Sequence, residues 1–235
     1  MSINTPSWFF DESAHAGDEH LDPEYVAAYD RKAGFDPAQD LGLLRTLGLN
    51  ECSVLVDMGA GTGSLALAAA PMCARVVAVD ISPAMLDVIR ARAEERRIGN
   101  IEIVRGGFLS YTHQGALADF VYSRHALHHL PDFWKAMALE RLAAVLNPGG
   151  ILHLRDLIFS FEPGETETRI EAWLAGAAAR PDDGWTRHEL DIHLHTEYSP
   201  FSWLLEAMLQ RTGFQIREVD RAASGIYAAY TCVRR

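Results

Sequence analysis

The sequence predicts an α/β fold in which helices wrap a doubly wound, mostly parallel sheet. Short runs rich in Val and Ile alternate with longer amphipathic stretches, which is the pattern of strands joined by helical crossovers. The last two strand-like runs leave no room for a helix between them, so they should pair antiparallel. With 235 residues, 49% of them hydrophobic, the chain is long enough for one large domain with its own core.

The first strand should cover residues 53–57, and a glycine-rich turn should lead from it into a helix over about 64–70. Residues 75–80 form the expected second strand. Ser82 can then cap a helix with Pro83 at its first position, where a proline costs no hydrogen bond. The remaining elements are expected as strands over 101–104, 118–122, 151–155, 215–219 and 226–233, with helices over about 133–146 and 201–212, the second closed by Gly213.

Composition argues against several classes of partner and site. The 21 basic and 32 acidic residues give a net charge of −11, which disfavours a nucleic-acid partner and an anionic membrane surface. No signal peptide and no run of about 18 apolar residues is visible, so a cytoplasmic protein is expected. Cys52, Cys73 and Cys232 are widely spaced, which predicts free thiols rather than a disulfide framework or a zinc site.

The turn after the first strand indicates a cofactor site. Gly59, Gly61 and Gly63 lie where a doubly wound sheet binds ligands, at the carboxyl end of a strand. Glycines allow positive φ and a close approach of the backbone to a ligand. Asp80 ends the second strand, where its carboxylate can accept hydrogen bonds from both hydroxyls of a ribose. The strand–turn–helix context together with this acid predicts a bound nucleoside.

Two classes of cofactor share this geometry. A dinucleotide places its pyrophosphate on the helix N-terminus and usually requires the spacing Gly-x-Gly-x-x-Gly. Here the spacing is Gly-x-Gly-x-Gly, and Asp57 stands two residues before the first glycine. A negative side chain there is badly placed for a pyrophosphate, but it suits the ammonium group of an amino acid. The spacing therefore disfavours a nicotinamide-dependent oxidoreductase, which stays the second candidate.

Four motifs in order carry a family resemblance over roughly residues 50–160. The run 54–63 (Val-Leu-Val-Asp-Met-Gly-Ala-Gly-Thr-Gly) resembles motif I of the class I S-adenosylmethionine-dependent methyltransferases. Residues 79–85, 122–132 and 146–150 are similar to the later motifs of that family. The resemblance implies a Rossmann-like sheet of order 3-2-1-4-5-7-6 with strand 7 antiparallel. It also implies S-adenosyl-L-methionine as cofactor, with S-adenosyl-L-homocysteine as product. The small-molecule branch that includes the ubiquinone/menaquinone-type enzymes is the most similar.

Matching positions to the family's motifs assigns the cofactor site. The glycines would shape the pocket for the methionine and ribose portions, Asp80 would hold the ribose, and Ile81 and Met85 would contact the adenine. The family often has an Asp after a glycine beyond the third strand, but this sequence has 106–108 (Gly-Gly-Phe) instead. A backbone N–H and the Phe108 ring are expected to replace that contact. The predicted cofactor-binding residues are Asp57, Gly59, Ala60, Gly61, Gly63, Asp80, Ile81, Met85, Gly107, Phe108 and Ser123.

The candidates for proton transfer follow strands four and five. His125 and His128 could each take a proton near neutral pH, and Asp156 ends strand five beside the expected substrate opening. A base is needed only if the acceptor arrives protonated. The competing interpretation makes these histidines part of the scaffold and Arg155 and Asp156 members of a structural salt bridge.

A metal site is one interpretation of the segment before the last helix. His188, His193, His195 and Glu197 include the ligand-like spacing His-x-His. The alternation over 191–196 equally fits a strand or turn with one polar face, and no metal is predicted.

Residues 1–40 are expected to form a helical cap over the cofactor site, and residues 41–235 the methyltransferase domain. Within that domain, residues 159–200 are predicted to be a substrate-side insertion, because long loops in compact domains are usually functional. The predicted function is methyl transfer to a small-molecule acceptor, without a nucleic-acid or membrane partner. The alternative is a protein of the same fold that acts on RNA or protein, or that binds ligand without catalysis. The oligomeric state stays open, a homodimer included.

Overall fold

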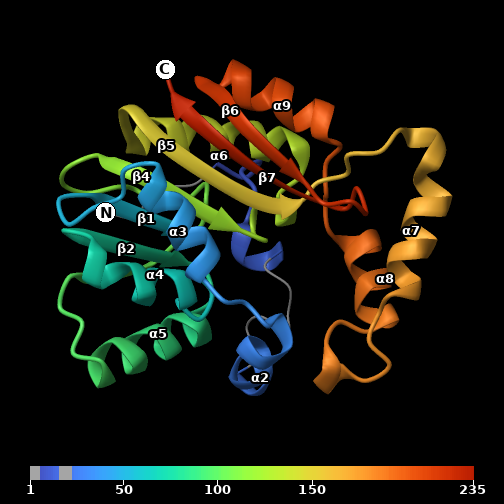
Figure 1. The fold of residues 1–235 in the computed structure, drawn as a ribbon, viewed down its shortest axis with the longest axis horizontal. Coiled ribbons are helices and arrows are strands. Elements are labelled where there is room, and N and C mark those ends of the chain that lie inside the picture. The colour runs from blue at the N-terminus through green and yellow to red at the C-terminus, as the bar shows by residue number, and fades with distance from the viewer. Residues whose placement is uncertain (1–5, 16–22) are drawn as a thin grey trace.

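The computed structural model describes residues 6–15 and 23–235, with a seven-stranded sheet at its centre (Figure 1). The strand order is β3-β2-β1-β4-β5-β7-β6. The first five strands pair parallel, whereas β7 runs antiparallel to both β5 and β6. The predicted fold class, strand order and reversed seventh strand are confirmed. The strands are β1 (Val54–Met58), β2 (Arg75–Asp80), β3 (Ile101–Arg105), β4 (Ala118–Arg124), β5 (Leu146–Leu157), β6 (Phe214–Arg221) and β7 (Tyr227–Arg234).

Successive strand residues enter two separate hydrophobic cores. Leu55 and Val76 pack in one core, whereas Val56 and Val77 pack in the other. Because strand side chains alternate between the faces of a sheet, the two cores lie on opposite faces. The first core includes residues of α3 (Ala38–Thr46), α4 (Ser64–Ala69) and α5 (Pro83–Glu95), and the second includes residues of α6 (Asp132–Val145) and α9 (Ser202–Arg211).

The local signals in the sequence act as expected, although several boundaries shift and the start of β5 shifts most. The Ser82 hydroxyl accepts a 3.2 Å hydrogen bond from the Met85 amide, which caps α5 as predicted. Gly213 follows α9 with φ of 95°. β5, however, begins at Leu146 rather than at 151, because Leu146 pairs with Ala118 across an irregular stretch of the β4–β5 ladder.

The segment expected as an insertion forms a helical lobe, defined here as residues 163–196. Residues 191–196 are helical, although their alternating polar and apolar side chains also fit a strand or turn. Thr186 and Glu189 form a capping box at the start of that helix. The lobe lies beyond the carboxyl ends of β4 and β5, away from the helices that cover the sheet (Figure 1). Its elements are η4 (Pro163–Glu165), α7 (Thr166–Ala175), η5 (Pro181–Asp183) and α8 (Arg187–Thr196).

The N-terminal part contributes two described elements, η1 (Glu12–His15) and α2 (Pro23–Ala33). The rest of the predicted cap before α3, residues 1–5 and 16–22, lies outside the described residues. An ion pair joins Lys32 of α2 to Glu189 of α8, and the Lys32 ammonium lies 4.8 Å from the centre of the Trp185 ring. α2 therefore bridges the α/β domain and the helical lobe.

The three cysteines are free, as predicted: Cys52 is exposed, and Cys73 and Cys232 are buried. Across the described residues, no helix combines the length and the apolar character that crossing a membrane requires.

Candidate active site

Glycine conformation shapes the turn between β1 and α4. The φ angles of Gly59 and Gly63 are 75° and 79°, in the left-handed region. A Cβ on Gly59 would lie 2.4 Å from the Cβ of Ala126, and one on Gly63 would lie 2.8 Å from Cγ1 of Ile89. Both conformation and space therefore require glycine at these positions.

A cavity, called here the turn cavity, opens beside these glycines at the carboxyl ends of β1, β2 and β4. Most of the predicted cofactor residues border it. Its lining comprises Phe10, Glu12, Tyr29, Met58, Gly59, Gly61, Asp80, Ile81, Ser82, Met85, Gly106, Gly107, Phe108, Arg124, His125, Ala126, His129 and Leu130. A smaller hollow continues past the turn and is lined by Asp57 and Ala60, together with Tyr29, Gly59, Gly61 and Arg124 of the turn cavity.

Asp80 lies at the mouth of the turn cavity and is oriented by the backbone. One carboxylate oxygen accepts a 2.7 Å hydrogen bond from the Gly61 amide, and the other accepts a 2.9 Å bond from the Ser82 amide. A carboxylate offers about four acceptor sites on its two oxygens, more than these two amides occupy.

Burial changes the acidity of Asp57 beneath the turn. This side chain is 2% exposed. Burial raises its pKa to about 7, a hydrogen bond from the Ala66 amide opposes the rise, and the negative charge of Asp80 adds to it. A positively charged ligand group in the adjoining hollow would favour the ionised carboxylate.

The turn after β3 carries the backbone N–H groups that the sequence suggested for the adenine. The Gly107 amide donates to the Ser110 hydroxyl at 2.8 Å, and the Leu109 and Ser110 amides donate to the Glu12 carboxylate at 3.0 Å. These amides have partners within the protein, and the expected contact of a backbone N–H with the adenine stays a prediction. A carboxylate from η1 also lies at this point.

Two predicted cofactor residues lie outside these linings. Gly63 packs against Ile89, and Ser123 is fully buried within β4. Arg124 and His125, which follow Ser123 in the chain, border the turn cavity in its place.

A second cavity of about 340 Å³, called here the lobe cavity, lies between the sheet and the helical lobe. It shares Tyr29, His125 and His129 with the turn cavity, so the two cavities adjoin at these three residues. Most of its other lining is aromatic or aliphatic. The full lining is Tyr29, His125, His128, His129, Leu157, Trp173, Trp185, Glu189, Leu190, Ile192, His193, Glu197 and Tyr227.

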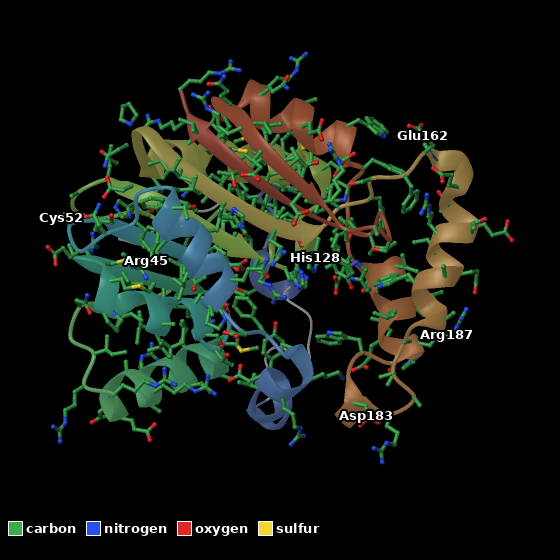
Figure 2. All side chains as sticks on the ribbon, viewed as in Figure 1. Arg45, Cys52, His128, Glu162, Asp183 and Arg187 are labelled. Atoms are coloured by element: carbon green, nitrogen blue, oxygen red, sulfur yellow. The ribbon has the colours of Figure 1, made fainter. Side chains whose placement is uncertain are left out.

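His128 lines the lobe cavity at its polar end, defined here by His128, His193 and Glu197. Figure 2 shows His128 between the sheet and the helical lobe. Its Nδ1 contacts a carboxylate oxygen of Asp156 at hydrogen-bonding distance, and its Nε2 lies 2.9 Å from Oε2 of Glu197. Burial lowers the pKa of His128, but the two carboxylates outweigh burial and raise this pKa to about 10. The imidazole is therefore protonated at neutral pH in the absence of a competing ligand. His128 and Asp156, which the sequence offered as separate candidates for proton transfer, are in direct contact.

His125 differs from His128 in both backbone and acidity. Its φ of 50° is unusual for a residue with a side chain, and its amide donates a 2.9 Å hydrogen bond to the carbonyl oxygen of Arg155. Burial lowers the pKa of His125 to about 3, and the charge of Arg124 adds to the fall. His125 is therefore a neutral side chain at the junction of the two cavities.

Arg155 and Asp156 have different roles because they point to opposite faces of β5. Arg155 pairs with Asp40 of α3 at 3.2 Å, whereas Asp156 binds His128. The structural salt bridge considered from the sequence therefore forms at Arg155, whereas Asp156 pairs with the protonated His128.

The histidines near the end of α8 separate into two groups. His193 and Glu197, one helical turn apart, meet His128, and the ligand atoms of the three side chains all lie within 4.8 Å of one another. His188 and His195 are exposed. The pair His193-x-His195 suggested by the spacing is therefore not the pair that the fold brings together.

Sequence reasoning missed several residues that border the cavities. Glu12 and Tyr29 reach the turn cavity from the N-terminal segment, and Trp173 and Trp185 reach the lobe cavity from the helical lobe. The capping box at Thr186 was a visible signal that this segment is helical. No local signal places Glu12, because its partner Leu109 lies 97 residues away.

Comparisons with known proteins agree with this geometry. Residues 55–150 match the family described as methyltransferase domain. The chain is 29% identical over 198 residues to the uncharacterized methyltransferase YrrT of Bacillus subtilis. The aligned region covers 84% of this chain and 82% of the relative. An uncharacterized methyltransferase of Exiguobacterium sibiricum is 28% identical over 83% of this chain and 80% of its own length.

Among solved structures, the magnesium protoporphyrin IX methyltransferase of Synechocystis with bound S-adenosylhomocysteine has a similar fold, with a TM-score of 0.65. It is 17% identical and covers 96% of this chain and 100% of that one. The two relatives are uncharacterized, and the solved structure is only 17% identical. Their names therefore identify no methyl acceptor for this chain. The match to a methyltransferase domain, the strand order and the cavity at the glycine turn all agree with one another.

Proposed function

We propose that the enzyme transfers the methyl group of S-adenosylmethionine to a small molecule bound in the lobe cavity. The observation that carries this proposal is the shared wall of Tyr29, His125 and His129 between the turn cavity and the lobe cavity. A donor in one cavity and an acceptor in the other would meet at this wall. Methyl transfer is an in-line displacement, so the protein has chiefly to align two bound molecules, an effect worth roughly 7–11 kcal/mol in well-oriented systems.

The cofactor would lie across the glycine turn. The carboxylate of Asp80 would accept hydrogen bonds from the ribose hydroxyls, while Ile81, Met85 and Phe108 would pack on the adenine. The methionine portion would enter the smaller hollow, where Asp57 would balance its ammonium group. The geometry of Asp80 and the burial of Asp57 support this placement.

Glu12 would replace the acidic residue that the family often carries after the third strand. A Cβ added to Gly107 would lie 2.5 Å from Oε1 of Glu12, so the Glu12 carboxylate occupies the space where a side chain at 107 would begin. This carboxylate borders the turn cavity next to Phe108. It would accept a hydrogen bond from the 6-amino group of the adenine.

The lining of the lobe cavity favours an acceptor with a flat apolar body and one polar end. Trp173, Trp185 and Tyr227 offer aromatic faces, whereas His128, His193 and Glu197 gather at one end. The atom that receives the methyl group would be oriented by this polar end. A concave site enclosed by an aromatic wall suits a small molecule better than a segment of RNA or protein.

A labelling experiment tests the proposal. Purified enzyme with methyl-labelled S-adenosylmethionine should transfer label to a compound in a small-molecule extract, and label appearing in protein or RNA instead would contradict the proposal. Ile192 lines the lobe cavity from α8, and Ile192→Trp should cut transfer at least tenfold while leaving S-adenosylhomocysteine affinity unchanged. The matched control is Arg187→Trp on the same helix, at an exposed position of the lobe (Figure 2).

A further inference from the structure

We propose that His128, His193 and Glu197 bind one divalent transition-metal ion of the zinc class at the polar end of the lobe cavity. The ligands would be Nε2 of His128, Nδ1 of His193 and a carboxylate oxygen of Glu197. Two histidines and one glutamate form a known ligand set for a metal site that keeps an open position. This proposal replaces the prediction of no metal made from the sequence.

The three ligand atoms already converge on one point. They lie within 4.8 Å of one another, and Nε2 of His128 is 2.9 Å from Oε2 of Glu197. Nδ1 of His193 contacts the same oxygen. The side chains of His128, His193 and Glu197 are only 5%, 11% and 16% exposed. Ligands about 2.0–2.2 Å from one tetrahedral ion lie roughly 3.4 Å apart, so ion binding would lengthen the present contacts to Glu197.

Partners on the outer side of each imidazole direct the inner nitrogens toward the same centre. Asp156 accepts from Nδ1 of His128, and the Ser199 hydroxyl lies 2.9 Å from Nε2 of His193. In a neutral imidazole whose outer nitrogen donates, the inner nitrogen carries the lone pair. Metal-binding histidines usually have a carboxylate or another acceptor in this outer position. Asp156 and Ser199 therefore act as positioning residues.

The atom at the centre of the cluster lacks a well-formed hydrogen bond. Oε2 of Glu197 is buried and has no hydrogen-bond partner of acceptable geometry, although both imidazoles lie close to it. In the metal-free protein the two imidazoles pair with this oxygen, and metal binding would release the proton that His128 carries. A cation shared with the two inner nitrogens would satisfy all three groups at once.

The elements that carry the ligands are fixed relative to each other. His193 and Glu197 are one turn apart at the end of α8, so they face the same side. The Tyr198 amide donates a 2.8 Å hydrogen bond to the carbonyl oxygen of His128, and the buried Lys135 ammonium contacts the carbonyl oxygen of Tyr198. The ligand set is thus held together by contacts that do not involve the ligands' own side chains.

The open side of the cluster faces the lobe cavity, since all three ligands line that cavity. A bound ion would hold an oxygen, nitrogen or sulfur atom of the acceptor beside the junction with the turn cavity. That role toward the acceptor rests on the proposed function, whereas the metal site itself does not.

Calorimetric titration of the full-length, chelator-treated protein with zinc chloride alone tests the site. Wild-type protein should bind one ion, and His193→Ala and Glu197→Gln should each weaken the affinity at least about 100-fold. Ser199→Ala should weaken it about tenfold, at the lower end of the range for outer partners of metal ligands. His195→Ala, two residues from His193 in the same helix but exposed, is the matched control and should leave the affinity within twofold.

Two further readouts keep the outcome clear. Affinity for S-adenosylhomocysteine should be the same in all variants, which shows that they fold. Cobalt(II) should give visible absorption bands in the wild type that are absent in His193→Ala. Equal zinc affinity in wild type and in the His193→Ala/Glu197→Gln double variant would overturn the metal site. That result would leave the small-molecule proposal standing, because the titration contains no acceptor.

Discussion

The backbone amide of Tyr198 donates a 2.8 Å hydrogen bond to the carbonyl oxygen of His128. This bond fastens the end of α8 to η3 (Leu127–His129), the turn that follows β4. It brings Glu197 against His128, so the helical lobe completes a site that begins at the sheet. The polar end of the lobe cavity is therefore built by two segments about 70 residues apart in the chain.

Removing the Asp80 carboxylate should weaken cofactor binding without unfolding the protein. We expect Asp80→Ala to lose about 10- to 100-fold in affinity for S-adenosylhomocysteine, since hydrogen bonds to a charged group contribute about 1.5–3 kcal/mol. Calorimetry measures the change. Asp87→Ala on α5, whose side chain is 73% exposed, is the matched control and should bind normally. Unchanged affinity in Asp80→Ala would remove its role at the ribose.

Glu12 should recognise the 6-amino group of the adenine. Wild-type protein should bind S-adenosylhomocysteine about tenfold more tightly than its inosine analogue, which lacks that amino group. In Glu12→Ala this preference should fall to about twofold, because a charge-assisted hydrogen bond is lost. Comparing the two ligands in each protein cancels any general loosening of the turn at Leu109 and Ser110. An undiminished preference in the variant would contradict the role.

The glycine turn should tolerate no side chain at Gly59. Gly59→Ala should lower both stability and cofactor affinity, because the added Cβ would lie 2.4 Å from the Cβ of Ala126 at a φ of 75°. Gly42 lies inside α3, and a Cβ there would meet nothing within 4 Å. Gly42→Ala should therefore raise stability, by about 0.5–1 kcal/mol. Denaturant unfolding measures the free energy of unfolding of both variants. Equal values for Gly59→Ala and Gly42→Ala would show that the turn is not constrained as described.

The contribution of Asp57 to the stability of the cofactor-free protein should fall as pH rises from about 4 to about 7. Burial raises the pKa of Asp57 from its usual 3.8 to about 7, so the folded state holds a proton that the unfolded state releases in this window. The stabilisation is complete below pH 3.8 and is lost as the pH rises through about 7. The contribution of this one group is about 1.4 kcal/mol per pH unit. Asp57→Asn should remove that part of the slope, and an unchanged slope would contradict the shift.

His128→Ala should slow turnover while leaving cofactor affinity unchanged. The side chain lines the lobe cavity but not the turn cavity, so its loss should affect the acceptor and not the donor. We expect a fall of about 10²–10⁴-fold in kcat/KM, the range for a group that moves or holds a proton. The exposed His188 of α8 provides the control, His188→Ala. Wild-type rates in His128→Ala across pH 6–8 would exclude it from the chemistry.

Much of the fold could be predicted because its signals are local. Val76 and Val77 show the continuous apolar run of a strand buried on both faces, and Ser82 with Pro83 marks a helix start within four residues. The glycine turn and Asp80 predicted, for the same reason, the place where the structure has the turn cavity. Local chemistry dictates these features, so sequence reasoning finds them.

The acceptor side could not be predicted, because long-range packing creates it. Glu197 meets His128 only after α8 folds against the turn that follows β4, and nothing near either residue in the sequence indicates the partner. The alternating polar and apolar residues before Thr196 also fit a strand. The segment is a helix, which the capping box at Thr186 indicates. Glu12 reaches the turn after β3 from the N-terminal segment, 97 residues before its partner Leu109.

The most direct test is a crystal structure of the protein with S-adenosylhomocysteine bound. The account predicts that the ribose hydroxyls contact Asp80 and that the sulfur lies at the wall formed by Tyr29, His125 and His129, directed toward the lobe cavity. A ligand bound elsewhere, or a sulfur directed away from the lobe cavity, would contradict it.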